Sequence, residues 1–402
     1  MFARIKQYIK YRYFLYFYAL TASWPCVLSF MGWLPPFKTG MMIIAVLSVL
    51  YALKQRGRVP SVIKTIFIVQ LITFFLYSFI HSDSSYITRC VILITAYSLI
   101  VVQAKRPKME FVNTNIFWLT LQAAMGGIGF VLTLVGILKP LSTFIEFDGH
   151  IGQFYGLYTT TVADDGMFRV AGFFDEPGAF AFWGFIALLF NKLYFDNKKV
   201  EVILIIGLIS TLSMAYFIQL PIYIFLFYRK RFGKMILPVI LLFLILKGVA
   251  SLSPQFNQAI FGRFQVDKST GKLEGDNRTE HGEFCKDIWL QSPVIGAGGN
   301  QVIAISLQKG QFAGASPYTY LATDGIVGYI VLLLPLFYIF SLGHRKRKYM
   351  YVGILLAIGL LQRPYDPTQL LYPLFFLTIC FEGYREVYLP CGKGNNGVAN
   401  YS

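Results

Sequence analysis

Long apolar runs recur along the whole chain, and short polar or basic breaks separate them. The runs are continuous rather than alternating, which favours membrane-spanning helices over the strands of a transmembrane barrel. The pattern therefore predicts an all-α transmembrane bundle in which residues 1–402 form a single membrane domain. We place about twelve spans at residues 13–31, 39–53, 61–80, 86–103, 112–137, 175–195, 200–213, 214–228, 234–252, 316–342, 349–362 and 368–383.

Two of the predicted connections are long, at residues 138–174 and 253–315, and we expect both to contain short helices. Long ordered connections in a compact protein are usually functional. Two predicted hairpins, at residues 200–228 and 349–383, cross the membrane twice in few residues. A helix of about 14 residues reaches about 21 Å, which is shorter than a hydrocarbon core of about 30 Å. We therefore expect polar groups at the outer tips of these hairpins to lie below the lipid surface.

Composition and charge favour a membrane protein over a nucleic-acid-binding protein. Hydrophobic residues make up 56% of the 402 residues and charged residues only 14%, whereas a soluble domain has about 25% charged residues. A net charge of +16 would suggest nucleic acid as the partner of a soluble protein. Here most lysine and arginine residues fall on one side of the predicted bundle, which marks that side as cytoplasmic. Both termini, including the tail at 384–402, then lie in the cytoplasm, and both long connections lie on the outer face.

A first polar segment with candidate chemistry runs from Arg169 to Pro177. Pro177 suits the first turn of a helix, which places Glu176 at the N-cap. The helix dipole keeps a carboxylate ionised at this position. An ionised carboxylate near Arg169 has the chemistry of a general base, although a simple ion pair at the helix start explains the same residues.

A second polar segment predicts a short amphipathic helix that begins near residue 277. Asn277, with Glu280 three residues later, resembles a capping box, and Arg278 falls at the helix start. Free backbone N–H groups there favour an anion, and a guanidinium adds a fork that fits phosphate. A surface helix with a solvated arginine is the alternative.

Charged residues are also predicted at membrane depth. Asp324 lies about two turns into the span that begins at Ser316 and Pro317, and an acidic residue in a membrane helix is by default functional. A structural ion pair is the alternative. Arg363 lies at the tip of a short hairpin. Arginines at this depth need anionic partners, either lipid-linked phosphate or outer carboxylates. The outer arginines are Arg89, Arg169, Arg263, Arg278 and Arg363.

The sequence predicts no metal site and no cofactor. The histidines have no metal-binding spacing, and the five cysteines form no C-x-x-C pair. Walker, G-x-S-x-G and H-E-x-x-H motifs are absent from the sequence, which argues against an ATPase, a hydrolase and a metalloprotease.

Taken together, these segments resemble the bacterial O-antigen polymerase family (Wzy), within the group that it shares with the O-antigen ligases. The resemblance covers residues from about 110 to 380 and depends on the order of several short motifs. These are R-x-x-G-F-F-x-E-P from Arg169 to Pro177, Asp276-Asn277-Arg278, Thr211-Leu212-Ser213, the turn from Ser292 to Gly298, the stretch from Tyr320 to Gly328, and Gln362-Arg363-Pro364.

The resemblance implies a glycosyltransferase that joins oligosaccharide repeat units carried on undecaprenyl pyrophosphate. The reaction would take place at the periplasmic face of the inner membrane, without a nucleotide sugar or a metal. Membrane lipid and a chain-length-regulating co-polymerase are the implied partners. Among the matched residues, the implied catalytic pair is Glu176, as base, and Arg278. The implied substrate and pyrophosphate ligands are Arg169, Arg263, Arg363, Asp324 and Tyr318.

Two other functions compete with the polymerase. An O-antigen ligase would transfer finished polymer to lipid A–core, but the related ligases have a histidine near the start of the helix that begins here at Ser316-Pro317-Tyr318. A flippase or transporter of lipid-linked oligosaccharide has binding residues near the midplane and often shows internal repeats. Neither feature is evident in this sequence.

Overall fold

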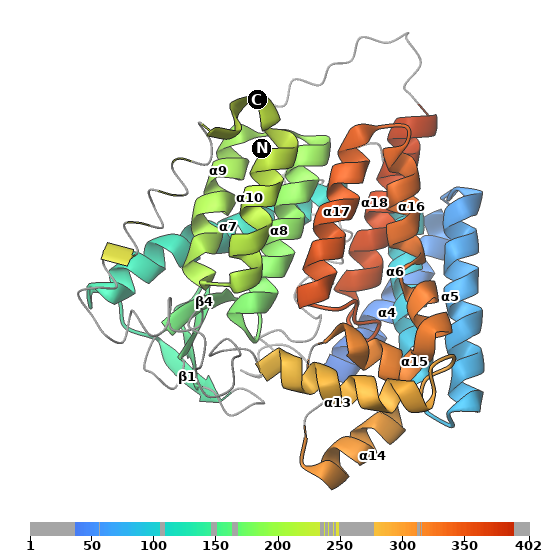
Figure 1. Ribbon diagram of the computed structural model, residues 1–402. Coiled ribbons are helices and arrows are strands. Elements are labelled where there is room, and N and C mark those ends of the chain that lie inside the picture. The colour runs from blue at the N-terminus through green and yellow to red at the C-terminus, as the bar shows by residue number, and fades with distance from the viewer. Residues whose placement is uncertain are drawn as a thin grey trace.

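The computed structural model describes residues 37–55, 57–104, 109–145, 151–162, 168–233, 277–311, 314 and 316–389, with a few single positions besides. These residues are mostly helical (Figure 1). The helices are, in chain order, α4 (Phe37–Gln55), α5 (Ser61–Ile80), α6 (Ser85–Ala104), α7 (Glu110–Leu134), α8 (Pro177–Tyr194), α9 (Lys198–Gly207), the 3-10 turn η1 (Leu208–Thr211), α10 (Met214–Phe227), the 3-10 turn η2 (Arg229–Arg231), α13 (Asn277–Gln291), α14 (Gly299–Lys309), α15 (Pro317–Leu332), α16 (Leu334–Gly343), α17 (Arg347–Gln362) and α18 (Leu371–Tyr388).

Four helical segments in the described part of the chain are long and apolar enough to cross a membrane. They are Ser61–Ile80, Ser85–Ala104, Glu110–Thr133 and Pro317–Gly343. The predicted span 13–31 and most of 234–252 lie outside the described residues, and the other predicted ranges coincide with helices. The class of helical membrane protein is therefore supported, while the count of about twelve spans stays a prediction.

The two hairpins predicted to be short are short. Helices α9 and α10 have 10 and 14 residues, with η1 between them. Helices α17 and α18 have 16 and 18 residues. Every residue from Leu208 to Ser213 is buried, and residues 362–370 include no exposed side chain. Both tips therefore lie inside protein rather than on its surface.

Helices α8 and α18 form the centre of the bundle. Residues from Ala179 to Asn191 of α8 are all buried, as are those from Leu371 to Gly383 of α18. A helix that is apolar on every face needs neighbours on every side, and α8 packs against α7, α9, α10 and α17. Glu176 immediately precedes α8, and the tip that carries Arg363 immediately precedes α18. The two central helices thus fix the positions of two predicted site residues.

The connection at 138–174 forms a sheet, so the prediction of short helices there was wrong. Its strands are β1 (Ser142–Ile145), β2 (Ile151–Phe154), β3 (Thr159–Val162) and β4 (Phe168–Gly172), paired antiparallel in that order. The β-branched run of β3 favours strand over helix. The described part of the 253–315 connection is helical, as predicted. Figure 1 shows the sheet, α13 and α14 at the same end of the bundle.

Candidate functional site

Glu176 stands at the N-cap of α8, as predicted, and the end of β4 holds it there. Gly172 adopts φ +62°, where a Cβ would lie 2.5 Å from the Gln122 side-chain oxygen. That oxygen, on α7, accepts a hydrogen bond from the Phe173 backbone N–H at 2.9 Å. Pro177 then begins the helix. The Glu176 carboxylate makes no capping hydrogen bond to the helix, so it is available to other partners.

The Glu176 carboxylate forms an ion pair with Arg363, whose Nη1 donates to Glu176 Oε1. Arg363 follows the last residue of α17, and its side chain is 13% exposed, whereas that of Glu176 is 43% exposed. Arg363 is therefore largely buried in protein, and its predicted depth below the lipid surface stays a prediction. A buried guanidinium thus orients a carboxylate that still reaches solvent, and a charge-assisted bond of this kind is strong.

Asp175 brings a second carboxylate to this pair. It lies in electrostatic range of both Arg363 and Glu176. Its Oδ1 atom is buried and has no hydrogen-bond partner among the described residues. Sequence reasoning missed Asp175, although it occupies the variable position before Glu176 in the motif. The site therefore contains two carboxylates around one guanidinium.

The tip between α17 and α18 is stabilised by its own hydrogen bonds. Asp366 accepts bonds from the Thr368 backbone N–H at 2.8 Å, from the Thr368 hydroxyl at 2.6 Å and from the Gln369 amide at 2.9 Å. An aspartate that bonds its own backbone two residues on is a common turn device. The turn keeps the backbone after Arg363 rigid.

Asp324 belongs to a different cluster, where Arg89 is its basic partner. Arg89 Nη1 donates to Asp324 Oδ1 at 2.7 Å, and the Tyr86 hydroxyl donates to the same oxygen at 2.7 Å. The Arg89 and Asp324 side chains are 5% and 1% exposed, and Arg89 also lies over the Tyr86 ring at 4.3 Å. Tyr77 donates to the Asp324 backbone carbonyl at 3.1 Å. This arrangement matches the structural ion pair and leaves the role of Asp324 in substrate binding a prediction.

Helix α15 is broken one residue after Asp324. Gly325 adopts φ +65° and ψ −174°, a conformation that is essentially confined to glycine. The preceding connection supplies the backbone bonds that the break removes. Residues 297 and 298 donate to the carbonyls of residues 322 and 323 at 2.7 and 2.9 Å, and residues 326 and 327 donate to those of 293 and 294 at 2.9 and 3.1 Å. The turn from Ser292 to Gly298 is therefore paired with α15.

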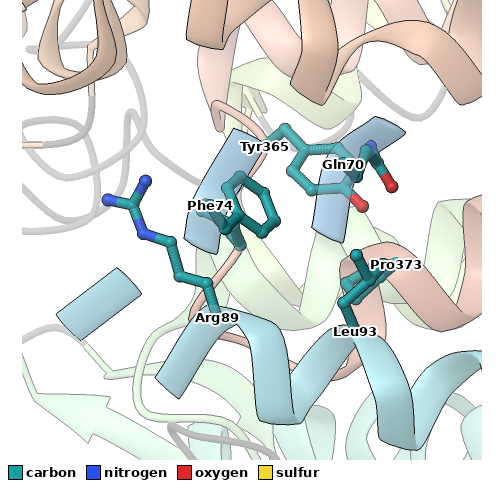
Figure 2. A pocket seen from close by; sticks show the side chains of 7 residues that line it. Gln70, Phe74, Arg89, Leu93, Tyr365 and Pro373 are labelled. Carbon is teal, nitrogen blue, oxygen red and sulfur yellow. The ribbon is translucent and has the colours of Figure 1, made fainter. Parts of the chain in front are cut away.

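A small cavity lies between this cluster and the α17–α18 tip (Figure 2). Figure 2 shows the Tyr365 ring beside Phe74 and Gln70, with the Arg89 guanidinium turned away from them. The Arg89 Nε and Gln70 Oε1 atoms are buried without a hydrogen-bond partner in the described part of the protein. The Arg89–Asp324 cluster and the Glu176–Arg363 pair therefore both adjoin the α17–α18 tip. The cavity lining consists of Gln70, Phe74, Arg89, Leu93, Tyr365, Pro367 and Pro373.

The other predicted site residues are Arg169, Tyr318, Arg278 and Arg263. Arg169 lies on β4 opposite Thr161. Tyr318 lies in the first turn of α15, with its ring centroid 6.2 Å from that of Trp289. Arg278 lies in the first turn of α13, but its side chain is outside the described part, as is the whole of Arg263.

The loop between α5 and α6 fixes the start of α14. Asp83 accepts hydrogen bonds from the backbone N–H of Ser85 at 2.8 Å and of Asn300 at 3.0 Å. Burial alone would raise the pKa of Asp83, but these bonds outweigh it and hold the pKa below its usual value. An ionised carboxylate at the N-terminus of α14 also interacts favourably with the positive end of the α14 dipole.

The site offers acid–base and anion-binding chemistry. A half-exposed carboxylate oriented by a buried guanidinium suits proton transfer, and guanidinium groups suit phosphate. Among the described residues, no group of three or more His, Cys, Asp or Glu side chains could hold a metal ion. No protein-family model, curated protein or solved structure matches this chain.

Proposed function

We propose that this chain is a membrane glycosyltransferase of the O-antigen polymerase type. It would join undecaprenyl-pyrophosphate-linked repeat units at the periplasmic face of the bacterial inner membrane, with about twelve spans, cytoplasmic termini and periplasmic long connections. The observation that carries the proposal is the contact between Glu176 and Arg363. These residues are 187 positions apart in the chain, and the resemblance singles out each of them independently.

In the proposed reaction a sugar hydroxyl of the incoming unit attacks the anomeric carbon of the growing chain. Glu176 accepts the hydroxyl proton as the new carbon–oxygen bond forms. The bond from the anomeric carbon to the phosphate oxygen breaks, and its electron pair leaves with undecaprenyl pyrophosphate. Arg363 orients Glu176 and keeps it ionised before the reaction. Arg278 and Arg169 are the proposed cations for the departing pyrophosphate, with Arg263 behind them.

The direct test combines purified protein with undecaprenyl-pyrophosphate-linked repeat units and lipid A–core, without nucleotide or added metal. A ladder of products on the undecaprenyl carrier is the expected result. Single units or polymer on lipid A–core would identify a ligase instead. Intact, folded protein that forms neither product would refute the proposed transferase.

Matched variants distinguish the loss of a site residue from a general loss of folded protein. Glu176→Gln and Arg363→Ala should abolish the ladder while the protein still elutes as a folded species. Glu283→Gln on α13 and Arg345→Ala before α17 change exposed residues of the same types, and both should leave the ladder intact. Equal losses in all four variants would remove the Glu176–Arg363 pair from the mechanism.

A lipid-linked oligosaccharide transporter is the second candidate, and the break in α15 favours it. Transporters place substrate at discontinuous helices near the membrane midplane, and Gly325 interrupts α15 in this way. Movement of fluorescently tagged lipid-linked units across vesicles, without polymerisation, would support the transporter over the polymerase.

A further inference from the structure

Helix α14 has an exposed apolar flank in addition to its packing face. The packing face includes Val302, which is buried against α13 and α15. At 3.6 residues per turn, Ile303 and Leu307 fall on one flank and Gln301 and Gln308 on the opposite flank. Ile303 is 58% exposed and Leu307 79% exposed. The helix is therefore amphipathic on its exposed side.

Exposed apolar residues also lie in the turn before α14 and at the end of α13. They are Leu290, Val294 and Ile295. A group of exposed apolar residues on neighbouring elements can mark a binding surface for protein or lipid. We call this surface the outer apolar strip. It consists of Leu290, Val294, Ile295, Ile303 and Leu307.

The strip is attached to the end of a candidate membrane span. His81, directly after α5, hydrogen-bonds the Ile295 carbonyl through Nε2 at 3.1 Å. A Cβ at Gly298 would lie 2.9 Å from His81 Cβ, so the backbone there packs directly on this loop. The last turns of α5 expose Phe75 and Phe79, and in a spanning helix such side chains face lipid. The strip is thus attached at the end of α5 that carries Phe79.

The surrounding residues suit the boundary between acyl chains and headgroups. Helix α14 contains no acidic residue, and its single charged residue is Lys309 in the last turn. Trp289 lies beside the strip and donates its indole N–H to the Pro293 carbonyl at 3.1 Å. Tryptophan is enriched at membrane interfaces, and an apolar flank opposite a polar flank with a basic residue is typical of an interfacial helix.

We propose that the outer apolar strip lies in the lipid bilayer and that α14 is an interfacial helix at the level of the phospholipid headgroups. Ile303 and Leu307 face the acyl chains, and Gln301 and Gln308 face water. Lipid is the occupant because Ile295 and Gly298 pack against His81, at the end of a helix that is long and apolar enough to span a membrane. This inference holds for a polymerase, a ligase or a transporter, since it depends only on membrane insertion of α5.

The test is lipid quenching of a fluorophore placed on either flank. Leu307→Cys and Gln301→Cys are made separately in a chain with Cys26→Ser and Cys391→Ser, and each is labelled with an environment-sensitive nitrobenzoxadiazole dye. The labelled proteins are reconstituted in phosphatidylethanolamine–phosphatidylglycerol vesicles, with or without phospholipids brominated on the acyl chains. The remaining cysteines, Cys90, Cys285 and Cys380, are buried.

Brominated lipid should lower the emission at Leu307→Cys by about twofold, as expected for a side chain 5–10 Å deep, and should leave Gln301→Cys unchanged. Equal quenching at the two positions would overturn the inference. So would a blue-shifted, unquenched dye at Leu307→Cys, because a protein partner or a second copy would then cover the strip. Ile303→Cys repeats the test on the same flank, and gel filtration of each labelled protein checks the fold.

Discussion

The Arg89–Asp324 ion pair is the interaction whose disruption we expect to destabilise the fold most. Asp324→Ala leaves a guanidinium that is 5% exposed without its counter-charge. It also removes the closer acceptor of the Tyr86 hydroxyl, at 2.7 Å, and leaves only the Thr323 carbonyl at 3.2 Å. Removing one partner of a buried pair costs about 3–5 kcal/mol, and a lost buried hydrogen bond costs about 1 kcal/mol more. We therefore expect Asp324→Ala to lower the free energy of unfolding by about 4–6 kcal/mol.

Two further variants test whether the unpaired charge of Arg89 causes the loss of stability in Asp324→Ala. The double variant Arg89→Met with Asp324→Leu removes both charges at similar volume, and it should recover most of the loss, because apolar replacements of buried pairs are often neutral. Asp196→Ala removes a carboxylate that is 58% exposed and pairs with Lys198, also 58% exposed, and with Lys192, which is 11% exposed. Because this carboxylate is mostly exposed, its removal should cost about 1 kcal/mol.

The assay is equilibrium unfolding in mixed micelles with a rising fraction of sodium dodecyl sulfate, followed by circular dichroism. The reasoning fails if Asp324→Ala is no less stable than Asp196→Ala, or if the double variant is no more stable than Asp324→Ala. A fully stable Asp324→Ala protein that forms no product would instead indicate that Asp324 contacts substrate.

Three other predictions follow from single residues. Glu176→Gln should slow ladder formation by about 10²- to 10⁴-fold in protein that still folds, and an unchanged rate would rule out Glu176 as the base. Gly325→Ala would bring Cβ to 2.3 Å from the Val294 carbonyl oxygen in a glycine-only conformation. It should cost about 2–6 kcal/mol of unfolding free energy, whereas Gly233→Ala, with no atom within 4 Å, should change it by less than about 0.5 kcal/mol. Asp83→Asn should speed amide hydrogen exchange at the start of α14. Because the pKa of Asp83 is lowered on folding, its contribution is present above the unfolded pKa of about 3.9 and is lost as the pH falls through the folded pKa. After correction for the intrinsic pH dependence of exchange, a native-protein exchange rate at the start of α14 that does not change on acidification would contradict this prediction.

Local signals in the sequence predicted where Glu176 and Arg363 lie on their own elements. Pro177 placed Glu176 at a helix start, and the few residues available to α17 and α18 placed Arg363 at a sunken tip. Both predictions use only the length and ends of neighbouring elements. The ion pair between them was not predicted, because no local pattern joins residues 187 positions apart.

Features that depend on distant partners escaped prediction for the same reason. The charge of Asp324 predicted a basic partner, but the sequence offered five outer arginines and did not show that Arg89 is the one. No sequence signal indicated the hydrogen bond from Tyr86. The break at Gly325 requires backbone partners from residues 293–298, which hydropathy does not reveal. The sheet was missed because its strands have four or five residues between longer apolar runs.

The pairing of α15 with residues 293–298 has a consequence for the assembly of the chain during synthesis. The four backbone bonds at the break use a segment that the ribosome makes before α15. An unpaired backbone group in hydrocarbon costs several kcal/mol, so the break at Gly325 would be unfavourable before residues 293–298 pair with it. Residues 293–298 precede α15 in the chain, so they are already present when α15 emerges from the ribosome. They can therefore pair with the backbone groups at the break as soon as it forms.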